Sequence, residues 1–180
     1  GTVIDKLLKS LIVTPIDYND IVVGDKNAIM IAARVLGYGK DYTFTIGDEE
    51  HTVDLTEVSD KELNEEHLLS KGQNEFEFTL PTIKKTINFK LLTHGDERKI
   101  DNEIKGIKKI KKNESPEAST RLKHMITSVD GDSERKTIRE FVDNQLLARD
   151  ARALRQYIKE IQPDVDLLFE IETEAGEKEV

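Results

Sequence analysis

The sequence contains no cysteine, and this removes several classes of site at once. Without a thiol there is no disulfide, no thiolate nucleophile and no zinc site with sulfur ligands. Tryptophan is also absent and only 6% of the residues are aromatic, which argues against a surface on which the bases of a single strand stack. No apolar run approaches the roughly 18 residues that a membrane-spanning helix needs, so we expect no such span.

What the chain has in excess is charge of negative sign. It carries 36 acidic and 27 basic residues among 180, which gives a net charge of −9. An acidic protein of this kind is a poor non-specific ligand for nucleic acid or an anionic membrane, so we expect neither as a partner.

The chain begins with Gly1 instead of Met and stops at Val180, where the return strand of an expected hairpin is only starting. We therefore expect it to be part of a longer protein.

The first half of the chain reads as helix followed by antiparallel strands. Thr14 and Pro15 have the pattern of a helix N-cap and first position. From Asp25, helical spacing of apolar residues leads to Gly37 and Gly39, which should end the helix. DYTFTI, GDEE and HTVDL then read as a hairpin. After a polar segment with a short helix at 60–69, NEFEFTL and INFKLLT alternate like strands, which completes a small antiparallel sheet between residues 42 and 93.

The second half reads as helical. Four isoleucines recur at helical spacing among charges: Ile100, Ile104, Ile107 and Ile110. Ser115 should begin a second helix that runs through Leu122, Met125, Ile126 and Val129, and Ser133 should cap a third. Asp150 should cap the last helix, which carries Leu154, Tyr157, Ile158 and Ile161 and ends before Pro163. Residues 166–180 then read as a closing hairpin.

These elements predict an α+β fold with small antiparallel hairpins near both ends of a helical middle region. The expected organisation is a helix and sheet region at 1–95, a helical region at 96–163 and a C-terminal hairpin at 164–180 that packs with the first part as one unit.

Nothing in the pattern marks a reaction centre. Gly39-Lys40 lacks the earlier glycine of a phosphate loop, where Arg34 stands, and it follows a helix instead of preceding one. The four histidines share no metal-binding spacing. We therefore expect no catalytic, cofactor-binding or metal-binding residues, no cofactor and no enzymatic activity.

The isoleucine seam formed by Ile100, Ile104, Ile107 and Ile110 is the candidate interaction face. A strip this narrow buries little surface unless it meets another surface, such as a partner protein. The overlapping segment KGIKKIKK at 105–112 is the one basic cluster. It leaves an alternative open, in which this is a small regulatory or nucleic-acid-associated protein that uses the basic helix 105–112.

Two stretches together resemble a known family. DIVVGDKNAIMIAARVLGYGKDYTFTI resembles the N-terminal part, and ARDARALRQYIKEIQPDVDLLFEIE the C-terminal part, of the baseplate hub subunits and hub assembly chaperones of T4-type bacteriophages. The matching positions are Gly24, Asp25, Lys26, Asn27, Arg34, Gly37, Gly39, Asp150, Leu154, Arg155, Tyr157, Ile158 and Pro163. The two stretches cover about a third of the chain, and residues 56–147 match only the variable middle of the family.

The resemblance implies a non-enzymatic role in building or forming the hub of a contractile tail's baseplate. The partners would be other tail or hub proteins, an oligomer is possible, and the location would be the virion or the host cytoplasm during assembly. Whether the chain is a permanent subunit or a chaperone stays open. Relatives carry Cys-x-x-Cys at one or both hairpin turns, but this chain has Gly47-Asp48-Glu49-Glu50 and Glu174-Ala175-Gly176-Glu177 there. Zinc is therefore not expected, and the family implies a C-terminal tail beyond Val180.

Overall fold

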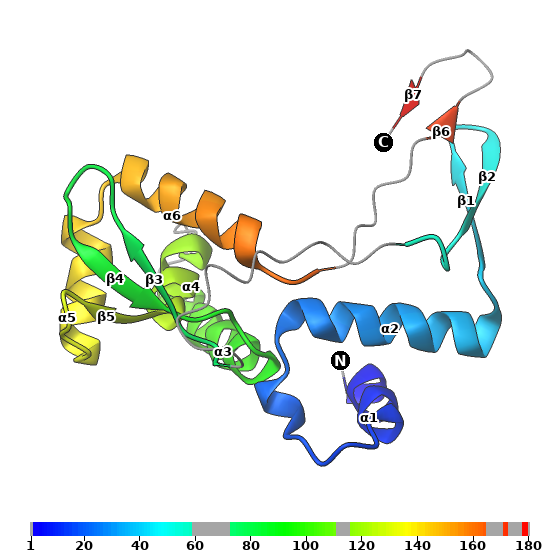
Figure 1. Cartoon of the computed structure of the whole chain (residues 1–180), viewed down its shortest axis with the longest axis horizontal. Coiled ribbons are helices and arrows are strands. Elements are labelled where there is room, and N and C mark those ends of the chain that lie inside the picture. Colours follow the sequence, from blue (N-terminus) through cyan, green and yellow to red (C-terminus); the bar gives the residue numbers. More distant parts are fainter. Residues whose placement is uncertain (1, 59–72, 111–115, 165–170, 173–177, 180) are drawn as a thin grey trace. The chain divides into compact units, whose positions relative to one another are not determined.

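The structure is a computed structural model, and it describes residues 2–58, 73–110, 116–164, 171–172 and 178–179. Helices and small antiparallel sheets make it an α+β fold, as predicted (Figure 1). The chain divides into two compact units. Unit 1 contains α1, α2, β1, β2, β6 and β7, and unit 2 contains the 3-10 turn η1 (Tyr18–Asp20) and every element from β3 to α6. No helix in the described part of the chain is long and apolar enough to cross a membrane.

The described residues of unit 1 form two helices and two antiparallel strand pairs. Helix α1 (Thr2–Leu11) precedes α2 (Val23–Tyr38), and β1 (Asp41–Ile46) pairs with β2 (Glu49–Asp54) in the predicted hairpin. Gly39, with φ +87°, ends α2 and Gly47, with φ +61°, makes the hairpin turn, two left-handed conformations that favour glycine. Strand β6 (Ile171–Glu172) pairs with β7 (Lys178–Glu179) in the expected closing hairpin.

The start of unit 1 differs from the prediction made at Thr14 and Pro15. These residues do not begin a helix: α1 ends at Leu11, and α2 begins only at Val23. Pro15 instead lies at the centre of a tight turn, closed by a hydrogen bond of 2.8 Å from the backbone N of Ile16 to the carbonyl of Thr14, where its missing N–H removes no helical hydrogen bond. The prediction failed because a cap-and-proline pattern also occurs in turns and extended segments.

Unit 2 has a three-stranded antiparallel sheet in the order β3-β4-β5. Its strands are β3 (Phe76–Thr79), β4 (Thr86–Phe89) and β5 (Ile126–Val129). The first two were predicted from their alternation. The third was not, because Leu122, Met125, Ile126 and Val129 also fit helical spacing. Helix α4 (Glu117–Met125) in fact ends before Ile126, and the Ile-Thr-Ser-Val segment pairs with the central strand β4.

Helices α3 (His94–Ile110), α4, α5 (Arg135–Glu140) and α6 (Ala148–Ile161), with the π-helical turn η3 (Phe141–Gln145), complete unit 2. Helix α6 lies beside the sheet, with Tyr157 stacked on Phe78 at 4.9 Å between ring centroids (Figure 1). Ser133 does not cap α5 as predicted. The N-cap position is Glu134, which makes no side-chain capping hydrogen bond, and the carboxylate of Asp132 before it accepts from the backbone N of Glu134 and the hydroxyl of Thr137. The fully buried residues of this core include Leu80, Ile87, Phe89, Ile100, Ile126, Ile138, Phe141 and Leu154.

The division into units does not follow the expected ranges. The expected boundary at residue 95 falls inside unit 2, because the sheet and the helices on both sides of that position share one hydrophobic core. Residues 17–22 also belong to unit 2, where Val22 pairs with Thr93. The expected helix at 60–69, the cap at Ser115 and the turn at 174–177 lie outside the described residues.

Candidate functional site

The isoleucine seam is partly a core feature. Ile100 is fully buried, so the prediction that it faces a partner is wrong. It is buried because α3 packs on the core of unit 2, to which Ile104 also contributes as a half-buried residue. Ile107 is half-buried, and the side chain of Ile110 lies outside the described residues. Ile100 and Ile104 of the seam therefore stabilise the core of unit 2 and do not form a free interaction face.

The basic segment 105–112 lies at the end of α3. Lys105, Lys108 and Lys109 are exposed there, and residues 111–112 lie outside the described part. Lys108 forms an ion pair with Glu117 at the start of α4, with 2.5 Å between Nζ and Oε1. Part of the positive charge on which the nucleic-acid alternative rests is thus already paired.

The two resembling stretches contain residues that contact each other within unit 1. Gly24 is buried against the carbonyl of Pro163: a Cβ at position 24 would lie only 1.6 Å from that oxygen. Next to this contact, the side-chain amide of Asn27 donates to Asp164 across 3.2 Å. Gly24, Asn27 and Pro163 are all positions of the resemblance, and they come from opposite ends of the chain.

Arg34 has a local task in the same unit. Its guanidinium donates to the carbonyls of Gly39 at 3.0 Å and Asp41 at 3.3 Å, and it lies 5.1 Å from the ring centroid of Tyr38. These bonds fix the turn between α2 and β1. Gly37, in contrast, has open space where its Cβ would be, and Asp25 is exposed in the first turn of α2.

The C-terminal positions of the resemblance other than Pro163 lie in unit 2. Asp150 does not cap its own helix as predicted, because the N-cap position is Leu147. Its buried carboxylate instead accepts hydrogen bonds from the backbone N of Thr82 at 2.8 Å and of Ile83 at 3.2 Å, in the β3–β4 connection. Burial raises the pKa of Asp150, but these hydrogen bonds outweigh it and leave the pKa below the ordinary value. Leu154 and Ile158 are core residues, Tyr157 packs on Phe78, and Arg155 is exposed.

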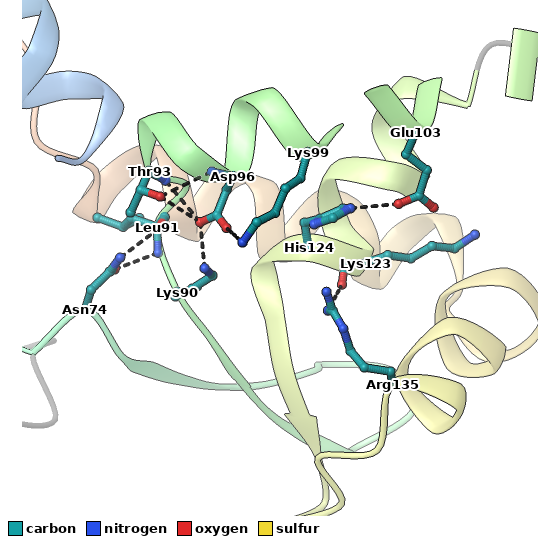
Figure 2. Close-up of polar contacts among 10 residues, drawn as sticks. All are labelled: Asn74, Lys90, Leu91, Thr93, Asp96, Lys99, Glu103, Lys123, His124 and Arg135. Atoms are coloured by element: carbon teal, nitrogen blue, oxygen red, sulfur yellow. Dashed lines mark hydrogen bonds and ion pairs between the residues drawn. The ribbon is translucent and has the colours of Figure 1, made fainter. Parts of the chain in front are cut away.

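A polar cleft beside α3 is the feature of unit 2 that sequence reasoning missed (Figure 2). It consists of a larger cavity of about 470 Å³ and a smaller one of about 250 Å³. Lys90, Asp96 and Lys99 line both. The larger cavity is completed by Asn19, Asp20, Thr93, Gly95, Arg98 and Asn102, and the smaller one by His124, Ile126, Thr127, Ser133, Arg135 and Ile138.

Asp96 occupies the centre of this cleft. Its Oδ2 accepts from Lys90 Nζ at 2.6 Å, from Thr93 N at 3.2 Å and from Thr93 Oγ1 at 3.1 Å. The hydroxyl of Thr93 in turn accepts from Asp96 N, which makes a capping box at the start of α3. Burial raises the pKa of Asp96, but Lys90 and Thr93 outweigh it, so the pKa lies below the ordinary value. The Thr-x-x-Asp spacing at 93–96 is the sequence signal that could have revealed this helix start.

His124 closes the other end of the cleft. Its Nε2 lies 2.8 Å from Oε2 of Glu103, whose Oε1 also accepts from Arg139 at 3.3 Å. Burial raises the pKa of Glu103, but the hydrogen bond with His124 and the charge of Arg139 outweigh it, so the pKa lies below the ordinary value. Arg135 reaches across to the carbonyl of Lys123 at 3.2 Å (Figure 2).

This chemistry does not resemble a metal centre. Within the described ranges, no three His, Cys, Asp or Glu side chains gather as they would around a metal ion. The cleft instead presents lysine and arginine groups, which suit hydrogen bonding to an anion.

Comparison with protein-family models, with curated proteins and with solved structures finds no match for this chain.

Proposed function

We propose that this chain is a non-enzymatic baseplate protein of a contractile phage tail, a hub subunit or a hub assembly chaperone that acts through protein–protein contacts. The supporting observation is the contact between the two stretches that resemble the family. Gly24 and Pro163 are both positions of the resemblance, and no side chain larger than hydrogen fits at 24 beside the carbonyl of 163. A chance similarity in two distant stretches gives no reason for them to meet.

The contact surface that fits this role lies on unit 1. Ile4, Leu7 and Leu11 lie at three- and four-residue spacing on α1 and are exposed, while Leu8 on the same helix is buried. Val13 and Ile16, which follow α1, are also exposed. Contiguous exposed apolar residues of this kind mark protein interaction sites. We therefore assign the contact to α1 in place of the isoleucine seam.

Two measurements on infected cells test the role itself. Quantitative mass spectrometry of purified particles should find a fixed small copy number if the chain is a hub subunit. If the chain is a chaperone, it should be absent from particles but be recovered with hub proteins in an affinity pull-down from the lysate. Absence from particles together with no recovery of hub proteins would refute the proposal.

A pair of variants tests the surface. Leu7→Asp places a charge within the apolar face of α1, whereas Ser10→Asp adds the same charge to another exposed position of that helix. Both should change stability by no more than about 0.5 kcal/mol, because both positions are exposed. Leu7→Asp should strongly reduce recovery of hub proteins and Ser10→Asp should retain it. Equal recovery with both variants would exclude α1 as the contact surface.

A further inference from the structure

The polar cleft of unit 2 has a positive lining in a negative protein. Four cationic side chains, those of Lys90, Arg98, Lys99 and Arg135, line its two cavities against two carboxylates, those of Asp20 and Asp96. The whole chain carries −9. A concave surface whose charge is opposite to that of the protein concentrates small ions of the complementary sign.

The carboxylate at the centre of the cleft is already neutralised. Asp96 forms its short ion pair with Lys90, and it accepts two further hydrogen bonds from Thr93. Lys99 forms a longer ion pair, 4.0 Å from the other oxygen of Asp96, which is too far for a hydrogen bond. In the smaller cavity three cationic side chains, those of Lys90, Lys99 and Arg135, thus face the one carboxylate of Asp96, which leaves an excess of positive charge.

The smaller cavity also contains a hydroxyl group, that of Ser133. Among the described residues, Arg135 donates one hydrogen bond to the protein, to the carbonyl of Lys123. Oγ1 of Thr127 has no hydrogen-bond partner within the described residues, but protein atoms enclose it, so a ligand in the cavity does not reach it. A guanidinium, an ammonium and a hydroxyl are donors that a phosphate group, with three acceptor oxygens, can use together.

We propose that the polar cleft binds a small phosphate ester, with the phosphate in the smaller cavity between Lys99, Arg135 and Ser133. The remainder of the ester lies over Lys90 and Asp96 in the larger cavity, where Asn19 and Asn102 supply amide groups for a polar body. A long polyanion is disfavoured, because the chain's net negative charge repels it. This site is independent of the proposed role in the baseplate.

Isothermal titration calorimetry at constant ionic strength tests this site with inorganic phosphate and with glucose 6-phosphate. Both should bind saturably, with Kd values of about 1 mM or below, and the ester should bind more tightly. No saturable binding of either compound up to about 10 mM would overturn the proposal. Equal affinity for both would overturn the assignment of the larger cavity.

Variants localise the binding. Lys99→Gln and Arg135→Gln should each weaken phosphate binding about tenfold, because each removes a charge-assisted hydrogen bond. Lys136→Gln, at the exposed position next to Arg135, is the charge-matched control and should bind like the original chain. An equal loss with Lys136→Gln would show a general charge effect and refute the site.

Discussion

Two alanine substitutions in the same helix should change stability in opposite directions. Gly24 and Gly37 are both positions of the family resemblance, and both lie in α2. A Cβ at 24 would lie 1.6 Å from the Pro163 oxygen and 2.5 Å from its carbonyl carbon, whereas a Cβ at 37 meets nothing within 4 Å. Neither glycine has the left-handed φ that would strain an alanine, so the difference between the two positions is one of space.

The magnitudes follow from this geometry. Ordinary van der Waals contact begins at 3.4 Å, so Gly24→Ala must move two backbone segments apart by about 1.8 Å. Overpacking on this scale costs about 3 kcal/mol. The better helix propensity of alanine offsets up to about 1 kcal/mol of this cost, so the free energy of unfolding should fall by about 2 kcal/mol. Gly37→Ala receives only the propensity term and should stabilise unit 1 by up to about 1 kcal/mol.

Hydrogen exchange is the appropriate assay, because a chain with two units need not unfold in one transition. Amides of α2 should exchange about 30-fold faster in Gly24→Ala, the factor that corresponds to about 2 kcal/mol. In Gly37→Ala they should exchange at the original rate or more slowly. Protection of α2 in Gly24→Ala equal to that in Gly37→Ala would refute the close contact with Pro163.

Three further changes test unit 2. Ile100→Ala should lower the free energy of unfolding in urea by about 2–5 kcal/mol, since the side chain is fully buried. An unchanged urea midpoint would show that Ile100 lies on the surface. Asp96→Ala should cost about 1 kcal/mol by removing the capping box of α3, and a matching loss of α3 amide protection would confirm the cause. Burial raises the pKa of Asp150, but the hydrogen bonds from Thr82 outweigh it, so the pKa in the folded state lies below the ordinary value of 3.8. The ionised carboxylate therefore stabilises the fold above pH 3.8, and this stabilisation is lost as the pH falls through the lower pKa of the folded state. Asp150→Asn should therefore reduce the loss of stability on acidification, and an unaltered stability–pH curve would contradict this.

The sequence predicted elements whose cause is local. The hairpin at 41–54 and strands β3 and β4 follow from alternation and turn residues, and the strands formed as expected. The prediction that they make one sheet between residues 42 and 93 was wrong, because β1 and β2 form a sheet of their own in unit 1 and β3 and β4 belong to the sheet of unit 2. Strand β5 could not be predicted in this way, because its apolar spacing fits a helix as well as a strand. The deciding interaction is pairing of Ile126 and Val129 with β4, which is about 40 residues away in the sequence and invisible to a local pattern.

The positions of the candidate functional residues were harder to predict, because they depend on contacts between residues far apart in the sequence. Asp150 looks like a helix cap in the sequence, yet its carboxylate binds backbone 67 and 68 residues away. Ile100 looks like part of an exposed seam, because nothing in its neighbourhood reveals that α3 packs on a sheet. The polar cleft draws Lys90, Asp96, His124 and Arg135 from separate elements, so no spacing rule connects them. Only the Thr93–Asp96 pair left a readable local signal.

The bond between Asn27 and Asp164 has a consequence for the order in which the chain folds. It joins residues 137 positions apart, and closing a loop of that length in an unfolded chain costs roughly 4 kcal/mol of entropy. Most of that loop is unit 2, which has a core of its own. Val22, which pairs with Thr93, and Gln162 both belong to unit 2. Once unit 2 has folded these two residues are held in one body, so forming the bond between Asn27 and Asp164 then costs little further chain entropy. Unit 1 should therefore fold second, and any change that unfolds unit 2 should release both ends of the chain together.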